Sequence, residues 1–170
     1  MRGFASFTHQ FRYEITSNDA VPASVGKNLT DVPRTIWSVG LHTMRMCSHE
    51  TFEDCPHYEQ MQYAGDTMIT SKLAMLTTGD YALSRQALYQ FDWSRLSDGL
   101  TQARFPSRLL QVIPAWSIHW ITNLRDYFLC TGDRATVQDL LPGVRAVLDW
   151  YRRHGDADGL PAKMPYWNIT

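Results

Sequence analysis

Carboxylates, imidazoles and thiols are concentrated in one stretch of the chain, residues 47–67. Three of its acids, Asp54, Glu59 and Asp66, stand five and then seven positions apart. When carboxyl groups are held close together, burial and the neighbouring like charge raise the pKa of one member, which then stays protonated. A protonated acid beside an ionised one is what glycosidic bond cleavage needs. The stretch therefore indicates acid–base catalysis, with a solvated acidic loop that caps helices as the alternative.

Histidines and cysteines in the same stretch suggest a metal or thiol site, but their spacing fits neither. A zinc protease helix reads His-Glu-x-x-His, whereas the position four residues after His49 is Glu53. His57 would continue that helical face, but Pro56 disfavours a continuous helix there. Cys55 and His57 are too close in sequence to present their side chains to one point as a nucleophile and its base. We therefore expect no metal and no cofactor.

The backbone of this stretch is expected to be irregular. Pro56 is expected to end the helix that enters from residue 33, because proline lacks an N–H and biases Cys55 away from the helical region. Gly65 marks a second point where the backbone has unusual freedom. We therefore expect the three carboxylates on a loop between two helices, and loops held by a rigid scaffold are where catalytic groups concentrate.

Apolar residues recur at helical spacing on both sides of the loop. Asp31 can cap a first helix, and Pro33 is placed near its first turn, where a missing N–H costs little. Further helices are predicted over residues 67–77, 83–91, 114–128 and 137–151. Pro142 lies inside the last of these, so it either kinks the helix or divides it in two. Residues 97–114, which contain two prolines and a turn, are predicted to form a structured connection.

A short motif occurs twice. Leu76-Thr-Thr-Gly-Asp80 and Leu129-Cys-Thr-Gly-Asp133 stand 53 positions apart, and each joins an apolar helix to a following one. Each Thr-Gly-Asp fits a glycine exit from one helix and an aspartate cap for the next. A repeat of this period indicates repeated helical hairpins, which stack into an open solenoid or close into a toroid. The chain holds two to three such hairpins, which would make up part of either array.

Composition and charge exclude several classes of function. The 170 residues carry a formal net charge of −1 with scattered basic residues, so neither a nucleic acid nor a membrane surface is an expected partner. No apolar run approaches the length of a membrane span, and residues 1–10 lack the apolar centre of a signal peptide. Three cysteines are an odd number, which favours free thiols over a disulfide framework. Residues 4–16 suit a β-strand, so the fold class is mainly α with a short N-terminal β segment.

The segment Asp54-Cys-Pro-His-Tyr-Glu-Gln-Met-Gln-Tyr-Ala-Gly-Asp66 resembles the Asp-Cys-Pro-x-x-Glu-(six residues)-Asp signature of the bacterial α-L-rhamnosidases, glycoside hydrolase family 78. Four other segments resemble the same family: residues 42–53, 90–95, 99–107 and 141–150. The resemblance runs from about residue 33 to residue 169. It implies an (α/α)6 toroid, preceded in these enzymes by β-sandwich domains, and hydrolysis with inversion at the anomeric carbon. Residues 1–30 would then be the tail of a β domain with its linker, and residues 31–170 part of the catalytic domain.

By position, the resemblance makes Glu59 the general acid that protonates the leaving oxygen, while Asp54 and Asp66 hold rhamnose hydroxyls. Tyr63 takes a place where many relatives have tryptophan, so it is expected to stack on the sugar. The substrate would be a rhamnose-containing oligosaccharide, polysaccharide or glycoside. Further candidates for the pocket, each of which could equally be a core or ion-pair residue, are Trp93, Arg104 and Trp116.

The family's general base is a glutamate from the later part of the toroid, which the resemblance places beyond Asn168. An inverting site needs both carboxyl groups, so we expect this chain to carry the acid half only and to be inactive alone. The remainder of the toroid is then an expected partner. The alternative is a non-catalytic helical-repeat module that binds carbohydrate or protein, and toroidal glycosidases of other specificity stay open because fold does not fix substrate.

Overall fold

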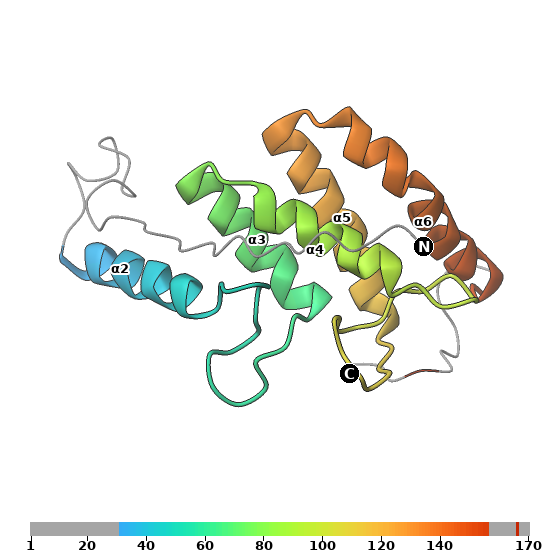
Figure 1. Ribbon diagram of the computed structural model, residues 1–170, viewed down its shortest axis with the longest axis horizontal. Coiled ribbons are helices and arrows are strands. Elements are labelled where there is room, and N and C mark those ends of the chain that lie inside the picture. The colour runs from blue at the N-terminus through green and yellow to red at the C-terminus, as the bar shows by residue number, and fades with distance from the viewer. Residues whose placement is uncertain (1–30, 157–165, 167–170) are drawn as a thin grey trace, which may run out of the picture.

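The computed structural model describes residues 31–156 and Tyr166, and this part of the chain is mainly helical (Figure 1). Its helices are, in order, α2 (Asp31–Met46), α3 (Ala64–Thr78), α4 (Ala82–Trp93), α5 (Pro114–Thr131) and α6 (Arg134–Arg153). Within the described residues, β pairing is limited to two isolated bridges, Ser48 with Phe52 and Tyr63 with Arg104. The mainly helical fold class is thereby confirmed, and the strand predicted for residues 4–16 lies outside the described residues.

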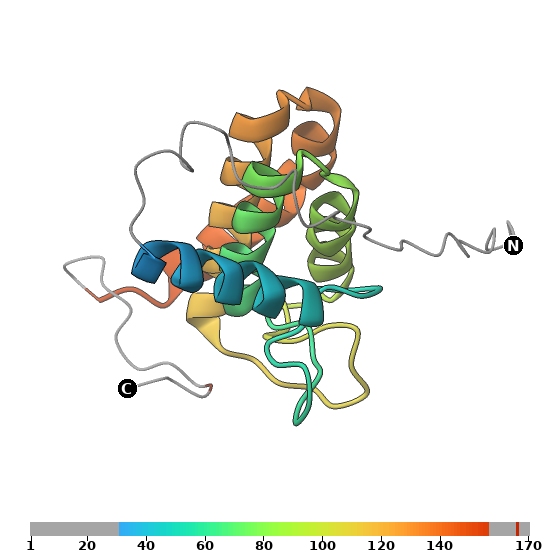
Figure 2. The ribbon, with the colours of Figure 1, turned by 90° about the vertical axis from the view of Figure 1, so that its left-hand side faces the viewer.

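The helices form two hairpins, α3 with α4 and α5 with α6, and α2 extends away from them (Figure 1). The main contact between the hairpins is made by α3 and α5. Figure 2, in which α2 faces the viewer, shows that helix running across α3 rather than along it. In the part of the chain that the structure describes, no helix combines the length and the apolar character that a membrane crossing requires.

Both hairpin turns have the geometry that the repeated motif predicted. Gly79 and Gly132 each lie at φ 69°, in the left-handed region that glycine tolerates best. Their N–H groups donate to the carbonyls of Met75 and Phe128, which closes the last turn of each preceding helix. The two turns are therefore copies of one structure, as expected for a repeated hairpin.

The aspartates of the two motifs differ in how they begin the next helix. Asp133 is the N-cap of α6, and its carboxylate accepts a hydrogen bond from the N–H of Thr136 at 3.1 Å. The Asp80 carboxylate accepts from the N–H of Ala82 at 2.8 Å, while the N-cap of α4 is Tyr81. The cap prediction is therefore confirmed for Asp133 and is off by one residue for Asp80.

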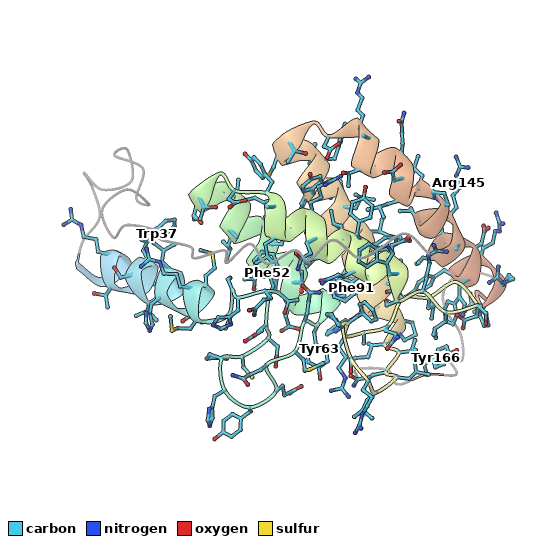
Figure 3. All side chains as sticks on the ribbon, viewed as in Figure 1. Trp37, Phe52, Tyr63, Phe91, Arg145 and Tyr166 are labelled. Carbon is cyan, nitrogen blue, oxygen red and sulfur yellow. The ribbon has the colours of Figure 1, made fainter. Side chains whose placement is uncertain are left out.

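The first helix ends earlier than predicted. It ends at Met46, ten residues before Pro56. The chain folds back after Cys47, whose carbonyl accepts a hydrogen bond from the N–H of Glu53 at 2.8 Å. This fold-back buries Phe52 (Figure 3), which is 1% exposed, in a small apolar cluster with residues of α2, α3 and α4. Burial of an aromatic ring outweighs helix continuation here, and it anchors the base of the loop.

Pro142 neither ends nor divides α6, which runs as one helix from Arg134 to Arg153. Gly143, which follows it, is packed so closely that an added Cβ would lie 2.0 Å from Asp92 Oδ1. The absence of a side chain at Gly143 therefore allows α6 to pack closely against the end of α4. The main core lies between the two hairpins and includes the fully buried side chains of Leu88, Phe91, Leu100, Trp120, Leu140, Val147 and Trp150.

Candidate active site

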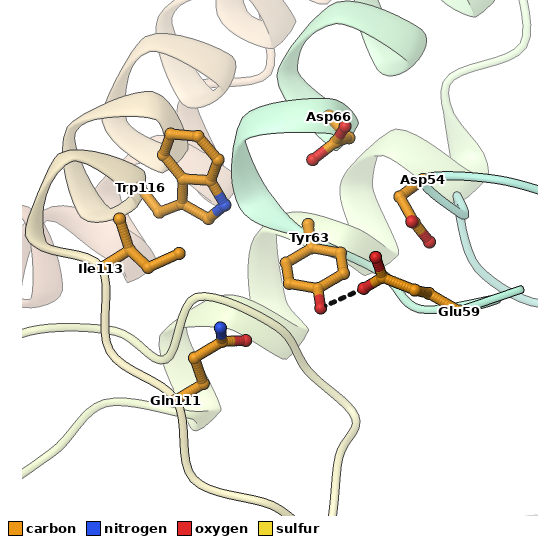
Figure 4. A pocket seen from close by; sticks show the side chains of 7 residues that line it. All are labelled: Asp54, Glu59, Tyr63, Asp66, Gln111, Ile113 and Trp116. Carbon is orange, nitrogen blue, oxygen red and sulfur yellow. Dashed lines mark hydrogen bonds between the residues drawn. The ribbon is translucent and has the colours of Figure 1, made fainter. Parts of the chain in front are cut away.

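One open cavity of about 420 Å³ collects the three carboxylates of the loop (Figure 4). Asp54 and Glu59 come from the loop between α2 and α3, and Asp66 comes from the first turn of α3. The remaining lining residues are Tyr63, Gln111, Ile113 and Trp116. The acids that the sequence places at positions 54, 59 and 66 therefore face a common space.

The loop that carries Asp54 and Glu59 is closed by its own hydrogen bonds. The N–H of Asp54 donates to the carbonyl of Met61, and the N–H of Met61 donates to the Asp54 carboxylate, both at 3.0 Å. Inside this ring the N–H of Glu59 donates to Cys55 Sγ at 3.3 Å, and Gln60 takes a positive φ of 51°. Asp54 thus stabilises the loop, while the Glu59 side chain projects from the tight turn.

Residues 62–64 are fastened to the connection between α4 and α5. The N–H of Ala64 donates to the carbonyl of Ala103 at 2.9 Å, and the N–H of Phe105 donates to the carbonyl of Gln62 at 3.0 Å. The buried amide of Gln62 also donates to the carbonyl of Phe105 at 2.7 Å. These bonds hold the Tyr63–Arg104 bridge, so both side chains start from a fixed backbone.

Tyr63 is engaged by polar groups rather than free. Its hydroxyl lies 2.5 Å from Glu59 Oε2 and 3.2 Å from Arg104 Nη1. The Arg104 guanidinium carbon also lies 5.8 Å from the centre of the Tyr63 ring. Partial burial, with the hydrogen bond to Glu59 as a further cause, raises the pKa of Tyr63, so its phenol stays protonated at neutral pH. Arg104 does not line the cavity itself but reaches the site through Tyr63.

The pKa of the Asp66 carboxyl group is raised above its ordinary value. Burial raises its pKa, and the charges of Asp54 and Glu59 raise it further. The backbone N–H bond within the first turn of α3 and the nearby His119 act in the opposite direction without cancelling the rise. Folding therefore disfavours the ionised form of this carboxylate.

Asp66→Asn is expected to stabilise the protein at neutral pH. Because the pKa of Asp66 is raised on folding, its stability cost is absent at low pH and grows as pH rises from the ordinary value to the raised one. The variant has no such cost. Its unfolding temperature should therefore exceed that of the unmodified protein by a few degrees at pH 7 and should equal it at about pH 3. Thermal unfolding followed by circular dichroism checks this, and an equal difference at both pH values would contradict it.

Trp116 forms a wall of the cavity from the first turn of α5. Its ring lies against Gly65, where an added Cβ would come within 2.8 Å of the indole carbon Cε2. A glycine at this position is therefore required for the ring to lie where it does. Figure 4 shows the indole nitrogen on the side of the ring that faces Tyr63 and Asp66. That nitrogen and Gln111 Oε1 have no hydrogen-bond partner among the described residues.

The structure separates the sequence candidates into groups. It gathers Asp54, Glu59, Tyr63, Asp66 and Trp116 around the cavity, and it places Arg104 behind Tyr63. The prediction for Trp93 needs correction, because this side chain is 69% exposed at the end of α4 and does not line the cavity. Its ring lies 6.2 Å from that of Tyr89 instead.

Sequence reasoning missed Gln111 and Ile113. Both lie in the connection before α5, which folds back so that the N–H of Ala103 donates to the carbonyl of Gln111 at 2.8 Å. The available signal was their closeness in sequence to Trp116, across Pro114. In the described residues no three potential ligand side chains cluster as a metal site would require, and His49 lies 3.2 Å from Glu53 as an i, i+4 pair.

A comparison with protein-family models gave a match that includes every described residue. The model of the bacterial alpha-L-rhamnosidase 6 hairpin glycosidase domain matches residues 30–169. The chain belongs to this family. Its helical hairpins are accordingly part of a six-hairpin glycosidase toroid, and the family resemblance noted from the Asp54–Asp66 segment is confirmed.

Two solved structures agree with this assignment. A GH78 family rhamnosidase from Bacillus sp. GL1 is 32% identical, with a TM-score of 0.74, over 79% of this chain and 14% of that one. A rhamnosidase from Klebsiella oxytoca, solved with rhamnose bound, is 26% identical, with a TM-score of 0.73, over 81% of this chain and 28% of that one. This rhamnosidase-family chain thus spans less than a third of either. A comparison with curated proteins gave no match.

Proposed function

We propose that this chain supplies the acid half of an inverting site that hydrolyses terminal α-L-rhamnosides. The observation that carries the proposal is the convergence of Asp54, Glu59 and Asp66 on one open cavity. The same cavity is lined by the indole ring of Trp116 and the amide side chain of Gln111.

Each carboxylate has a role that fits its surroundings. Glu59 is exposed at the mouth of the cavity, where a leaving-group oxygen can reach it, and we assign it as the general acid. Asp66 is half-buried and Asp54 is fixed by Met61, so these two are assigned to accept hydrogen bonds from sugar hydroxyls. The Trp116 ring offers an apolar face for the sugar, while the Tyr63 hydroxyl is engaged with Glu59.

The base that activates water is assigned to another part of the longer protein. An inverting site holds its two carboxyl groups roughly 6.5–9.5 Å apart, with the attacking water between them. The exposed apolar side chains Ile69, Leu73 and Leu76 lie on one face of α3, and we propose that further helices of the toroid cover them. For these 170 residues alone we expect no hydrolysis, and turnover by the purified chain would contradict the assignment of the base.

The proposal is tested with the full-length protein and a panel of nitrophenyl glycosides that differ only in the sugar. We expect release of nitrophenol from the α-L-rhamnoside at a kcat/KM at least about 100-fold above that for the other sugars. Faster hydrolysis of a different sugar would contradict the substrate assignment. Binding of rhamnose without turnover of any glycoside would favour the non-catalytic binding module instead.

A further inference from the structure

The contacts of Glu59 extend the proposed mechanism, on which this inference rests. We propose that Arg104 and Tyr63 form a positioning pair that holds Glu59 by Oε2, so that Oε1 carries the proton given to the leaving group. Tyr63 is thereby assigned to the acid and not to the sugar. Arg104 acts only through Tyr63, since it does not line the cavity.

The chemistry of the donors fixes the direction of the two hydrogen bonds. An arginine guanidinium has N–H donors and no acceptor. At 3.2 Å, Arg104 Nη1 therefore donates to the hydroxyl oxygen of Tyr63. The hydroxyl proton of Tyr63 is then directed to Glu59 Oε2, 2.5 Å away. Oε2 accepts this bond, so a proton on Glu59 belongs on the other oxygen.

The placement of Glu59 Oε1 agrees with this assignment. In Figure 4 the dashed bond joins Tyr63 to one carboxylate oxygen, and the other oxygen turns toward the side where Asp54 and Asp66 lie. A proton on Oε1 would thus face the space that the three acids share. When Oε1 donates it, the Tyr63 hydroxyl already stabilises the carboxylate that forms, without any rearrangement.

The backbones that carry Tyr63 and Arg104 are held by hydrogen bonds, whereas the Glu59 side chain is exposed. Tyr63 and Arg104 face each other across a bridge that is flanked by hydrogen bonds at 2.9 and 3.0 Å. Glu59 is exposed on a tight turn, and an exposed glutamate on such a turn has several rotamers open to it. A bond from a fixed tyrosine selects one of these rotamers, which is the function of a positioning residue.

Proton transfer from Glu59 accompanies cleavage of the glycosidic bond. The bond between the anomeric carbon and the leaving oxygen breaks, and its electron pair stays on that oxygen. The oxygen takes the proton from Glu59 Oε1, while a water oxygen bonds to the anomeric carbon and loses its proton to the base in the rest of the toroid. The Tyr63 proton stays on Tyr63, in keeping with the raised pKa of its phenol.

The direct test is a titration of the Glu59 carboxyl carbon by ¹³C NMR, with its signal identified by its loss in Glu59→Gln. Tyr63→Phe removes a donor to the ionised form, so the midpoint should be higher in this variant than in the unmodified protein. Arg104→Met should raise the midpoint of Glu59 by less than Tyr63→Phe does. When it is combined with Tyr63→Phe, it should raise the midpoint little further. The matched control is Tyr58→Phe, which removes the hydroxyl of a residue that is 90% exposed on the same loop and should leave the midpoint unchanged.

An unchanged midpoint in Tyr63→Phe, or a shift as large in Tyr58→Phe, would overturn the assignment. In the full-length protein, Tyr63→Phe should lower kcat by about 10-fold with little change in KM, and should move the alkaline limb of the pH–rate profile upward. The NMR result stands apart from catalysis. The midpoint of Glu59 could rise in Tyr63→Phe as expected while Glu59→Gln still hydrolyses the rhamnoside. That combination would refute the proposed role of Glu59 as the acid, but it would leave the positioning of Glu59 by Tyr63 intact.

Discussion

Replacement of Glu59 by glutamine should lower kcat/KM of the full-length protein by about 10³–10⁴-fold for rhamnosides with alkyl or sugar leaving groups. Glutamine keeps the size of the side chain and can still accept from Tyr63, but it has no proton to give. A nitrophenolate leaves readily without a proton, so the loss on the nitrophenyl rhamnoside should be at least about 10-fold smaller. The dependence on the leaving group, rather than the loss itself, identifies an acid.

Glu50→Gln is the matched control for Glu59→Gln. Glu50 is exposed on the same segment and does not line the cavity, so the control removes the same charge from nearly the same region. Its kcat/KM should stay within about twofold of the unmodified protein, because an exposed charge outside the cavity is screened by water and salt. Equal losses for both leaving groups in Glu59→Gln, or a comparable loss in Glu50→Gln, would remove Glu59 from the role of acid.

The largest effect on stability is expected for Trp120→Ala. Trp120 is 0% exposed between the two hairpins, and its Nε1 donates to the carbonyl of Leu88 at 3.0 Å. Truncation leaves a cavity and an unpaired carbonyl, so the free energy of unfolding should fall by about 3–5 kcal/mol. Urea denaturation followed by circular dichroism measures this change.

Trp93→Ala makes the same chemical change at an exposed site. Trp93 is 69% exposed, so the substitution should cost less than about 1 kcal/mol and should leave the cavity intact. A loss for Trp120→Ala that is no greater than that for Trp93→Ala would mean that the hairpins do not pack around Trp120. The pair of variants therefore tests the arrangement of α3 to α6 without reference to activity.

The gathering of the three carboxylates around one cavity could be predicted because these residues lie close together in the sequence. Asp54, Glu59 and Asp66 are separated by few residues, so a single loop can bring them together. The turns at Gly79 and Gly132 depend on nearby residues only. Both features follow from residue types and from short-range geometry. They are also the features that the structure reproduces most closely.

The misplaced features depend on contacts between distant segments. The end of α2 is set by the burial of Phe52 among residues of three helices, which no local rule about Pro56 includes. Trp93 and Trp120 look equally apolar in sequence, and only the packing of the hairpins decides which one is buried. Gln111 reaches the cavity because its carbonyl accepts a hydrogen bond from the N–H of Ala103. The composition of the connection between α4 and α5 does not predict this pairing.

The most direct test of the proposed inverting site is the anomeric configuration of the first product. ¹H NMR can follow the full-length protein as it hydrolyses an aryl α-L-rhamnoside, faster than the released sugar mutarotates. An acid on one face of the sugar and a water-activating base on the other predict that β-L-rhamnose appears first and the α anomer grows in later. If α-L-rhamnose appears first, the reaction proceeds with retention, and Glu59 is not half of an inverting pair.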